Sequence, residues 1–172
     1  STPRLDLVVL DGPTLARITL REPVDLPFSI HGLLDDALDV VTIRLAQIAD
    51  DPSATPWLLR AIVLRAEQRA VGFINFHAPP RARPDGNMVV EIGYEVLPAD
   101  RRRGYAREAV GGMLAWAKAN GATVVRACVR PDNIASRAML DGYTQVGEQV
   151  DDVDGLELIF EKPLSSADQG PT

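Results

Sequence analysis

The chain has 172 residues, of which 46% are hydrophobic and 24% charged, and its formal net charge is -6. The acidity argues against nonspecific nucleic-acid binding, the single cysteine excludes an internal disulfide, and no apolar run approaches the ~20 residues of a membrane span. We therefore expect a cytoplasmic protein of one domain that has neither nucleic acid nor a membrane as its partner.

The first half of the chain predicts a strand, a helical segment and a hairpin. Residues 4–11 alternate in polarity as a strand does. Within residues 33–50, apolar side chains recur at helical spacing, at Leu34, Leu38, Val41, Leu45 and Ile48. The β-rich runs 57–66 and 70–78 are separated by a short polar turn and predict two paired strands.

The second half predicts a third strand at 87–98 and a helix from Gly104 to the stop signal at Asn120-Gly121. A strand at 123–129, a short helix at 134–140 and a final hairpin around residues 151–155 follow. This order predicts a mixed α/β fold in one domain over residues 1–164. The small polar residues 165–172 predict a disordered tail.

The densest positive cluster of this acidic chain stands where the helix at Gly104 begins, in the stretch "EVLPADRRRGYAREA" (Glu95–Ala109). A helix start exposes unpaired N–H groups and the positive end of the helix dipole. Arginines add charge-assisted hydrogen bonds, and Gly104 lets the backbone approach a ligand. The cluster therefore suits a phosphate group, although a solvated basic turn without a ligand would have the same sequence.

A second landmark joins this motif. Arg101, Gly104 and Ala106 fit Gln/Arg-x-x-Gly-x-Gly/Ala, and "VRPDNIASRAML" carries Asn133 and Ser136 as Asn-x-x-Ser at a helix start. In this order the chain resembles the GCN5-related N-acetyltransferases (GNAT), in particular the RimJ/RimL-like branch. The resemblance runs over about residues 2–164, with the specific part between Glu91 and Gly147. It implies a mixed, mostly antiparallel central sheet flanked by helices.

The resemblance implies an enzyme that moves an acetyl group from acetyl-CoA directly to an amine in a ternary complex, without a metal. A backbone N–H near Val96 or Leu97 would stabilise the oxyanion. The residues expected to bind the cofactor are Val96, Leu97, Arg101, Arg102, Arg103, Gly104, Tyr105, Ala106, Arg107, Asn133 and Ser136.

The catalytic assignments are less specific. Glu95 and Glu91 are candidate bases for the amine, and each is equally compatible with a solvated strand carboxylate. Leu140 stands where many family members have a tyrosine acid, so Ser136 and then Tyr143 are the candidate acids, and a CoA thiolate can also leave unaided.

Other site chemistries have less support. The chain lacks the G-x-G-x-x-G of a dinucleotide site, the P-loop lysine, HExxH and CxxC. His31 and His77 are far apart in sequence, and Cys128 lies in a strand pattern typical of a packed thiol. The acceptor stays open between protein N-termini and small amines, a homodimer stays open as a partner, and a noncatalytic acyl-CoA-binding module is the alternative function.

Overall fold

The computed structural model describes residues 2–30, 32–33, 37–151 and 155–164. The strands are β1 (Leu5–Val9), β2 (Arg60–Leu64), β3 (Arg69–Phe76), β4 (Arg81–Ala82), β5 (Met88–Val96), β6 (Val124–Val129), β7 (Thr144–Asp151) and β8 (Gly155–Pro163). The helices are α1 (Gly12–Thr19), α2 (Leu38–Asp50), α3 (Tyr105–Ala119) and α4 (Ile134–Arg137), with short 3₁₀ turns η1 (Pro52–Trp57) and η2 (Pro98–Asp100). Leu34, His31 and the tail predicted at 165–172 lie outside the described residues.

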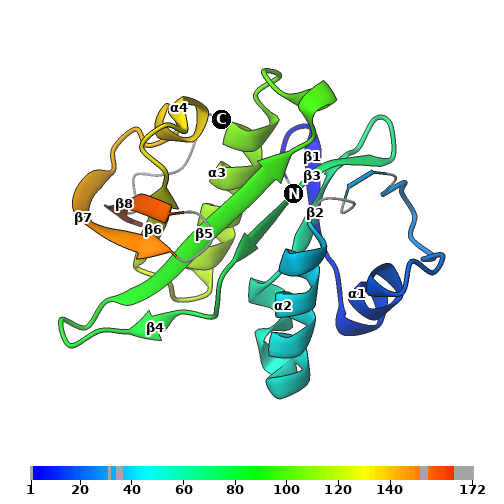
Figure 1. The fold of residues 1–172 in the computed structure, drawn as a ribbon, viewed down its shortest axis with the longest axis horizontal. Helices are drawn as coiled ribbons and strands as arrows, with labels where there is room; N and C mark the ends of the chain where they lie inside the picture. Colours follow the sequence, from blue (N-terminus) through cyan, green and yellow to red (C-terminus); the bar gives the residue numbers. More distant parts are fainter. Residues whose placement is uncertain (1, 31, 34–36, 152–154, 165–172) are drawn as a thin grey trace. The chain divides into compact units, whose positions relative to one another are not determined.

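The strands follow the hydrogen-bonding order β1-β2-β3-β5-β6-β8-β7, and β4 pairs with β5. β5 and β6 run parallel, whereas β1–β2, β2–β3, β4–β5, β6–β8 and β7–β8 are antiparallel. The predicted mixed, mostly antiparallel sheet is therefore confirmed (Figure 1). β8 rather than β7 lies next to β6, so the last hairpin folds back on itself at the end of the sheet.

The described residues form two compact units. The first contains the chain up to Pro79 together with Tyr94–Met113, and the second contains Pro80–Gly93 and the chain from Leu114 onward. The single domain expected over residues 1–164 stays a prediction.

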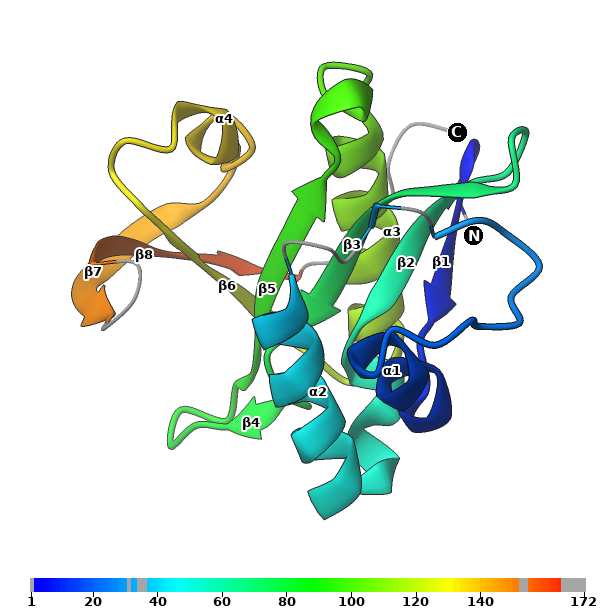
Figure 2. The same ribbon diagram turned by 45° about the vertical axis from the view of Figure 1, so that its right-hand side comes forward.

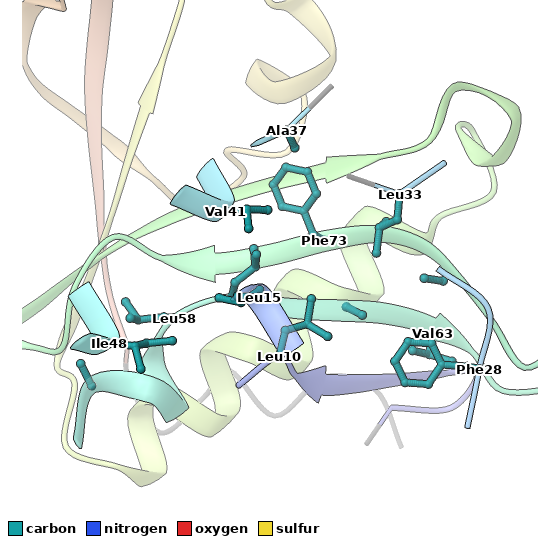
Figure 3. Close-up of a cluster of buried hydrophobic side chains, with 14 residues drawn as sticks. Leu10, Leu15, Phe28, Leu33, Ala37, Val41, Ile48, Leu58, Val63 and Phe73 are labelled. Carbon is teal, nitrogen blue, oxygen red and sulfur yellow. The ribbon is translucent and has the colours of Figure 1, made fainter. Parts of the chain in front are cut away.

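In the first unit, α1 and α2 pack on one face of β1, β2 and β3 (Figure 2). Leu15 of α1, Val41 of α2 and Phe73 of β3 belong to one buried cluster (Figure 3). The sequence analysis did not anticipate α1, although its signals are present. Asp11 accepts a hydrogen bond from the N–H of Thr14 over 2.9 Å as an N-cap, and a proline follows in the first turn.

The first turns of α3 pack on the opposite face of this unit. Val8 of β1 lies against the α1–α2 cluster, so the preceding residue, Leu7, faces the other side. A Cβ atom at Gly112 would lie 3.5 Å from Leu7 and closer still to Thr2, whereas one at Gly111 would meet nothing within 4 Å. Close packing therefore explains Gly112, and Gly111 is simply tolerated.

In the second unit, β6 is hydrogen-bonded to β5 on one side and to β8 on the other. An ion-pair cluster ties these strands to the loop after β4, because Glu161 of β8 accepts hydrogen bonds from Arg83 and, over 3.0 Å, from Arg126 of β6. The hydrogen bond from Arg83 lowers the pKa of Glu161, and burial opposes that shift. Within the described part of the chain, no helix is both long and apolar enough to cross a membrane.

Candidate functional site

β5 changes neighbours along its length. Val89–Glu91 pair in parallel with Val124–Arg126 of β6, and the ladder ends there. At the end of β5, Leu97 donates its backbone N–H to the carbonyl of Val71 on β3 over 2.9 Å. Since successive residues of a strand direct their backbone groups to opposite edges, the N–H of Val96 faces away from β3. Of the two N–H groups expected to polarise a carbonyl, that of Leu97 is already donated, so the geometry favours Val96.

The segment between β5 and α3 presents several backbone N–H groups. η2 closes where Asp100 donates its N–H to the carbonyl of Leu97 over 2.8 Å. Arg102 and Gly104 then take left-handed conformations, with φ of 62° and 79°. Such alternation turns successive N–H groups towards one side of the chain and forms an anion-binding concavity.

The start of α3 extends this concavity. Glu108 donates its N–H to the carbonyl of Gly104 over 3.1 Å, so the N–H groups of Tyr105, Ala106 and Arg107 precede the first turn of intrahelical bonds. They lie at the positive end of the helix dipole. A phosphate group fits this combination of free N–H groups and positive potential.

The four arginines of this region have different surroundings. Arg101 donates from Nε to the carbonyl of Val96 over 2.9 Å, and its Nη2 lies 3.6 Å from Glu95. Arg103 lies 3.8 Å from the carboxylate of Asp100. Arg102 and Arg107 are exposed, and their side chains make no hydrogen bond or ion pair within the described part of the chain. The two charges most available to a ligand are therefore those of Arg102 and Arg107.

The two candidate bases lie in different surroundings. Glu95 is about half exposed beside Arg101 in the first unit. Glu91 belongs to the second unit, close to Cys128. Burial raises the pKa of the Cys128 thiol to about 12, and the negative charges of Glu91 and Glu157 add to the rise. A thiol with so high a pKa is no nucleophile at neutral pH, which agrees with the packed thiol expected at this position.

The Asn133–Ser136 corner forms the start of α4. The Oδ1 atom of Asn133 accepts a hydrogen bond from the backbone N–H of Ser136 over 3.0 Å, so Asn133 is the N-cap. The hydroxyl of Ser136 makes no hydrogen bond to any described residue. Tyr143 lies in the turn that starts at Leu140, and the Nζ atom of Lys162 lies 5.9 Å from the centre of its ring.

Three residues that the sequence analysis did not single out hold the segment Arg101–Gly104. Asp100 is buried and accepts two hydrogen bonds from Arg69. Arg4 donates to the carbonyl of Arg103 over 3.1 Å and binds Glu108 of α3 over 2.6 Å. Arg4 lies 99 positions before Arg103 and Arg69 lies 31 positions before Asp100, so no local pattern links them to this segment. Only the proximity of Asp100 to the basic cluster offered a signal.

Among the described residues, no group of three or more His, Cys, Asp or Glu side chains is arranged to hold a metal ion.

Similarity to known proteins indicates the family of the chain. Residues 30–142 match the family model described as an acetyltransferase (GNAT) domain. A curated relative, L-2,4-diaminobutyric acid acetyltransferase of Nocardia farcinica, is 28% identical, with 78% of each chain covered. The solved structure of ribosomal-protein-S5-alanine acetyltransferase from Vibrio fischeri has a TM-score of 0.63 at 14% identity over 96% of both chains. That of yncA from Salmonella typhimurium, solved with its cofactor acetyl-CoA, has a TM-score of 0.60 at 18% identity over 95% of both chains.

The family model covers more than half of the chain, including the end of β5 and residues 101–107. The N–H groups of Arg102–Ala106 are of the kind that can bind a phosphate group. The chain therefore belongs to the GNAT acetyltransferases and is an acyltransferase whose cosubstrate is acetyl-CoA.

Proposed function

We propose that this enzyme transfers the acetyl group directly from acetyl-CoA to an amine within a ternary complex. The observation that carries the proposal is that the N–H of Val96 faces away from β3 and that a second group of N–H groups follows, from the left-handed turn at Arg102 and Gly104 into the start of α3. One end of this run suits a polarised carbonyl oxygen, and the other suits a pyrophosphate.

In this proposal the pantetheine arm of acetyl-CoA lies along the edge of residues Tyr94–Leu97 that faces away from β3. The pyrophosphate binds the N–H groups of Arg102–Ala106, because that of Arg101 is donated to the carbonyl of Pro98 over 3.4 Å. Arg102 and Arg107 add charge because their side chains are uncommitted. The carbonyl of Val96 is bonded to Arg101, so Arg101 holds the strand end in place. Asn133 and Ser136 stay proposed contacts of the cofactor.

Acetyl-CoA supplies an activated acetyl thioester. An ammonium has no lone pair, so a carboxylate must first accept a proton from the acceptor, directly or through water. We assign this role to Glu95, because it adjoins Val96 on β5, with Glu91 as the second candidate. The amine nitrogen then bonds to the acetyl carbon while the N–H of Val96 stabilises the oxyanion, and the carbon–sulfur bond breaks.

The departing thiolate takes its proton from solvent or from a protein hydroxyl. Leu140 cannot supply one. Ser136 has a hydroxyl without a hydrogen bond to the described residues, and Tyr143 lies in the turn that follows Leu140. A CoA thiolate is a fair leaving group, so we expect neither hydroxyl to be indispensable.

We propose that the acceptor is a small amine or a protein N-terminus. The curated relative is named for a diamino acid, which favours a small cationic amine, and the net charge of -6 agrees with a cationic acceptor. The RimJ/RimL-like motif and the ribosomal-protein acetyltransferase among the structural neighbours support the N-terminus.

Amine-dependent release of CoA tests the proposal. Purified protein with acetyl-CoA would be offered 2,4-diaminobutyrate, spermidine and peptides with free N-terminal alanine or serine, and the acetylated product would be identified by mass spectrometry. We expect release with at least one amine and with none of the same compounds acetylated in advance. Binding of acetyl-CoA without amine-dependent release would instead support a noncatalytic acyl-CoA-binding module.

A further inference from the structure

We propose that the ion pair between Arg69 and Asp100 positions the phosphate-binding segment Arg101–Gly104 and screens it from the charge of Asp100. The inference rests on the proposed acetyl-CoA site and adds two residues to it. Both are positioning residues, because they act through the backbone and the electrostatics of the adjacent segment.

The geometry of the pair is that of a rigid fork. Nη1 and Nη2 of Arg69 donate to the two carboxylate oxygens of Asp100 over 2.7 and 2.8 Å. The Nε atom of the same guanidinium donates to Glu67 over 2.6 Å, which fixes the plane of the fork. The Asp100 side chain is only 4% exposed, against 32% for that of Arg69. A buried, bidentate pair of this kind restrains both of its backbone segments.

Asp100 stands at the point where that restraint has most effect. Its N–H closes η2 on the carbonyl of Leu97, and two residues later Arg102 is left-handed, with φ of 62°. A residue with a side chain keeps this conformation only where its surroundings impose it. Asp100 precedes the strained residue, and the bond from Arg4 to the carbonyl of Arg103 follows it. The concavity for phosphate is therefore held from both sides.

Charge gives the pair a second effect. A buried carboxylate one residue before Arg101 would repel an incoming pyrophosphate, because little water separates the charges. Arg69 neutralises that carboxylate, and its hydrogen bonds lower the pKa of Asp100. Loss of Arg69 alone would leave the loop loose and the Asp100 carboxylate paired only with the exposed Arg103, 3.8 Å away. Loss of both side chains would leave the loop loose but without the Asp100 charge. A difference in acetyl-CoA affinity between the single and the double variant therefore distinguishes positioning and screening from simple support of the fold.

The test compares acetyl-CoA with acetyl-pantetheine, which carries the same thioester but no pyrophosphate. We expect Arg69→Met to raise the calorimetric Kd for acetyl-CoA at least tenfold. Its kcat/KM with acetyl-pantetheine should stay within about twofold of wild type. The double variant Arg69→Met/Asp100→Asn should recover part of the affinity, and Arg69→Lys, which keeps the charge without the fork, should bind more tightly than Arg69→Met.

Arg83→Met is the matched control. Arg83 lies in the loop after β4, and both of its terminal nitrogens donate to the carboxylate of Glu161 instead of Asp100. Its side chain is 29% exposed, close to the 32% of Arg69. Arg83→Met should leave the preference for acetyl-CoA over acetyl-pantetheine unchanged.

Two results would overturn the inference while wild-type protein binds acetyl-CoA: an unchanged Kd in Arg69→Met, or equal losses with both donors. If Arg69→Met does not fold, the same comparison between acetyl-CoA and acetyl-pantetheine is made with Arg69→Lys, and the same two results would overturn the inference. Wild-type protein that fails to bind acetyl-CoA would overturn the proposed function, and this inference with it.

Discussion

Gly72 of β3 passes so close to β5 that a Cβ atom there would overlap the carbonyl oxygen of Glu95 and lie 3.0 Å from the Cα atom of Val96. The contact is between backbones, so no side chain can rotate away to relieve it. The absence of a side chain at Gly72 therefore fixes where the end of β5 lies, and with it the Val96 N–H that we assign to the oxyanion.

Gly72→Ala tests this relationship. The added methyl group must push the end of β5 away, and a displacement of about 1 Å near the reacting atoms can lower kcat on the order of 10²-fold. Overpacking should also lower the free energy of unfolding by about 1–3 kcal/mol. The control is Gly111→Ala in α3, where a Cβ meets nothing within 4 Å. It should leave kcat unchanged and stabilise the helix by up to ~1 kcal/mol. Equal kcat in both variants would contradict the assignment.

Gly104→Val should weaken acetyl-CoA binding at least tenfold, because a side chain there disfavours the left-handed backbone at φ of 79° and lies against the Nη2 atom of Arg4, 3.4 Å from the Cβ position. Calorimetry gives the affinity, and thermal unfolding gives the loss of stability. Gly86→Val is the matched control, since Gly86 has φ of 82° and open space around its Cβ position in the loop after β4. Both variants carry the same backbone strain, so only a loss of affinity confined to Gly104→Val supports the phosphate site.

Catalysis should not pass through Cys128. With burial raising its pKa to about 12, on the order of one thiol in 10⁴ is ionised at pH 8. We expect folded protein to react with iodoacetamide far more slowly than urea-unfolded protein, and Cys128→Ala to keep substantial turnover. An acetylated Cys128 that passes its acetyl group on to product, followed by intact-mass spectrometry, would refute direct transfer.

Variants of Asn133 and Ser136 distinguish helix capping from a role in catalysis. Asn133→Ala removes the N-cap of α4 and should cost about 1 kcal/mol of stability or less, because this helix has only four residues. Ser136→Ala keeps the backbone N–H that Asn133 binds, so we expect nearly unchanged melting. Its kcat should fall about tenfold or less, below the 10²-fold low end for a positioned acid. A thousandfold loss with intact folding would make Ser136 the general acid.

The stability of the protein should depend on Asp100 at low pH. Hydrogen bonds from Arg69 hold the pKa of Asp100 below its ordinary value of 3.8. A carboxyl whose pKa is depressed on folding stabilises the folded state fully above its unfolded pKa, and that contribution is lost as the pH falls through the folded value. Urea unfolding should show Asp100→Asn to be less stable than wild type at pH 7, with the gap closing below about pH 4. A gap that persists at acid pH would contradict this reading.

The sequence alone predicted the elements whose signals are local. Period-two alternation predicted β1, Gly104 predicted the start of α3, and Asn-x-x-Ser predicted the start of α4. α1 was missed because its eight residues follow a strand without a long apolar period, although the cap at Asp11 and the proline after it were there to see.

Tertiary structure decided which of the candidate groups are available. The sequence treated the backbone of Val96 and Leu97 alike, yet pairing with β3 uses the N–H of Leu97 and turns that of Val96 the other way. The sequence treated Arg101, Arg102 and Arg103 as one cluster. In the structure, Arg101 donates a hydrogen bond to the carbonyl of Val96, whereas the side chain of Arg102 makes no hydrogen bond or ion pair to the described residues. Hydrogen bonds between residues distant in sequence make these distinctions, so no spacing along the chain encodes them. For the same reason Arg69, 31 positions before Asp100, was found only in the folded chain.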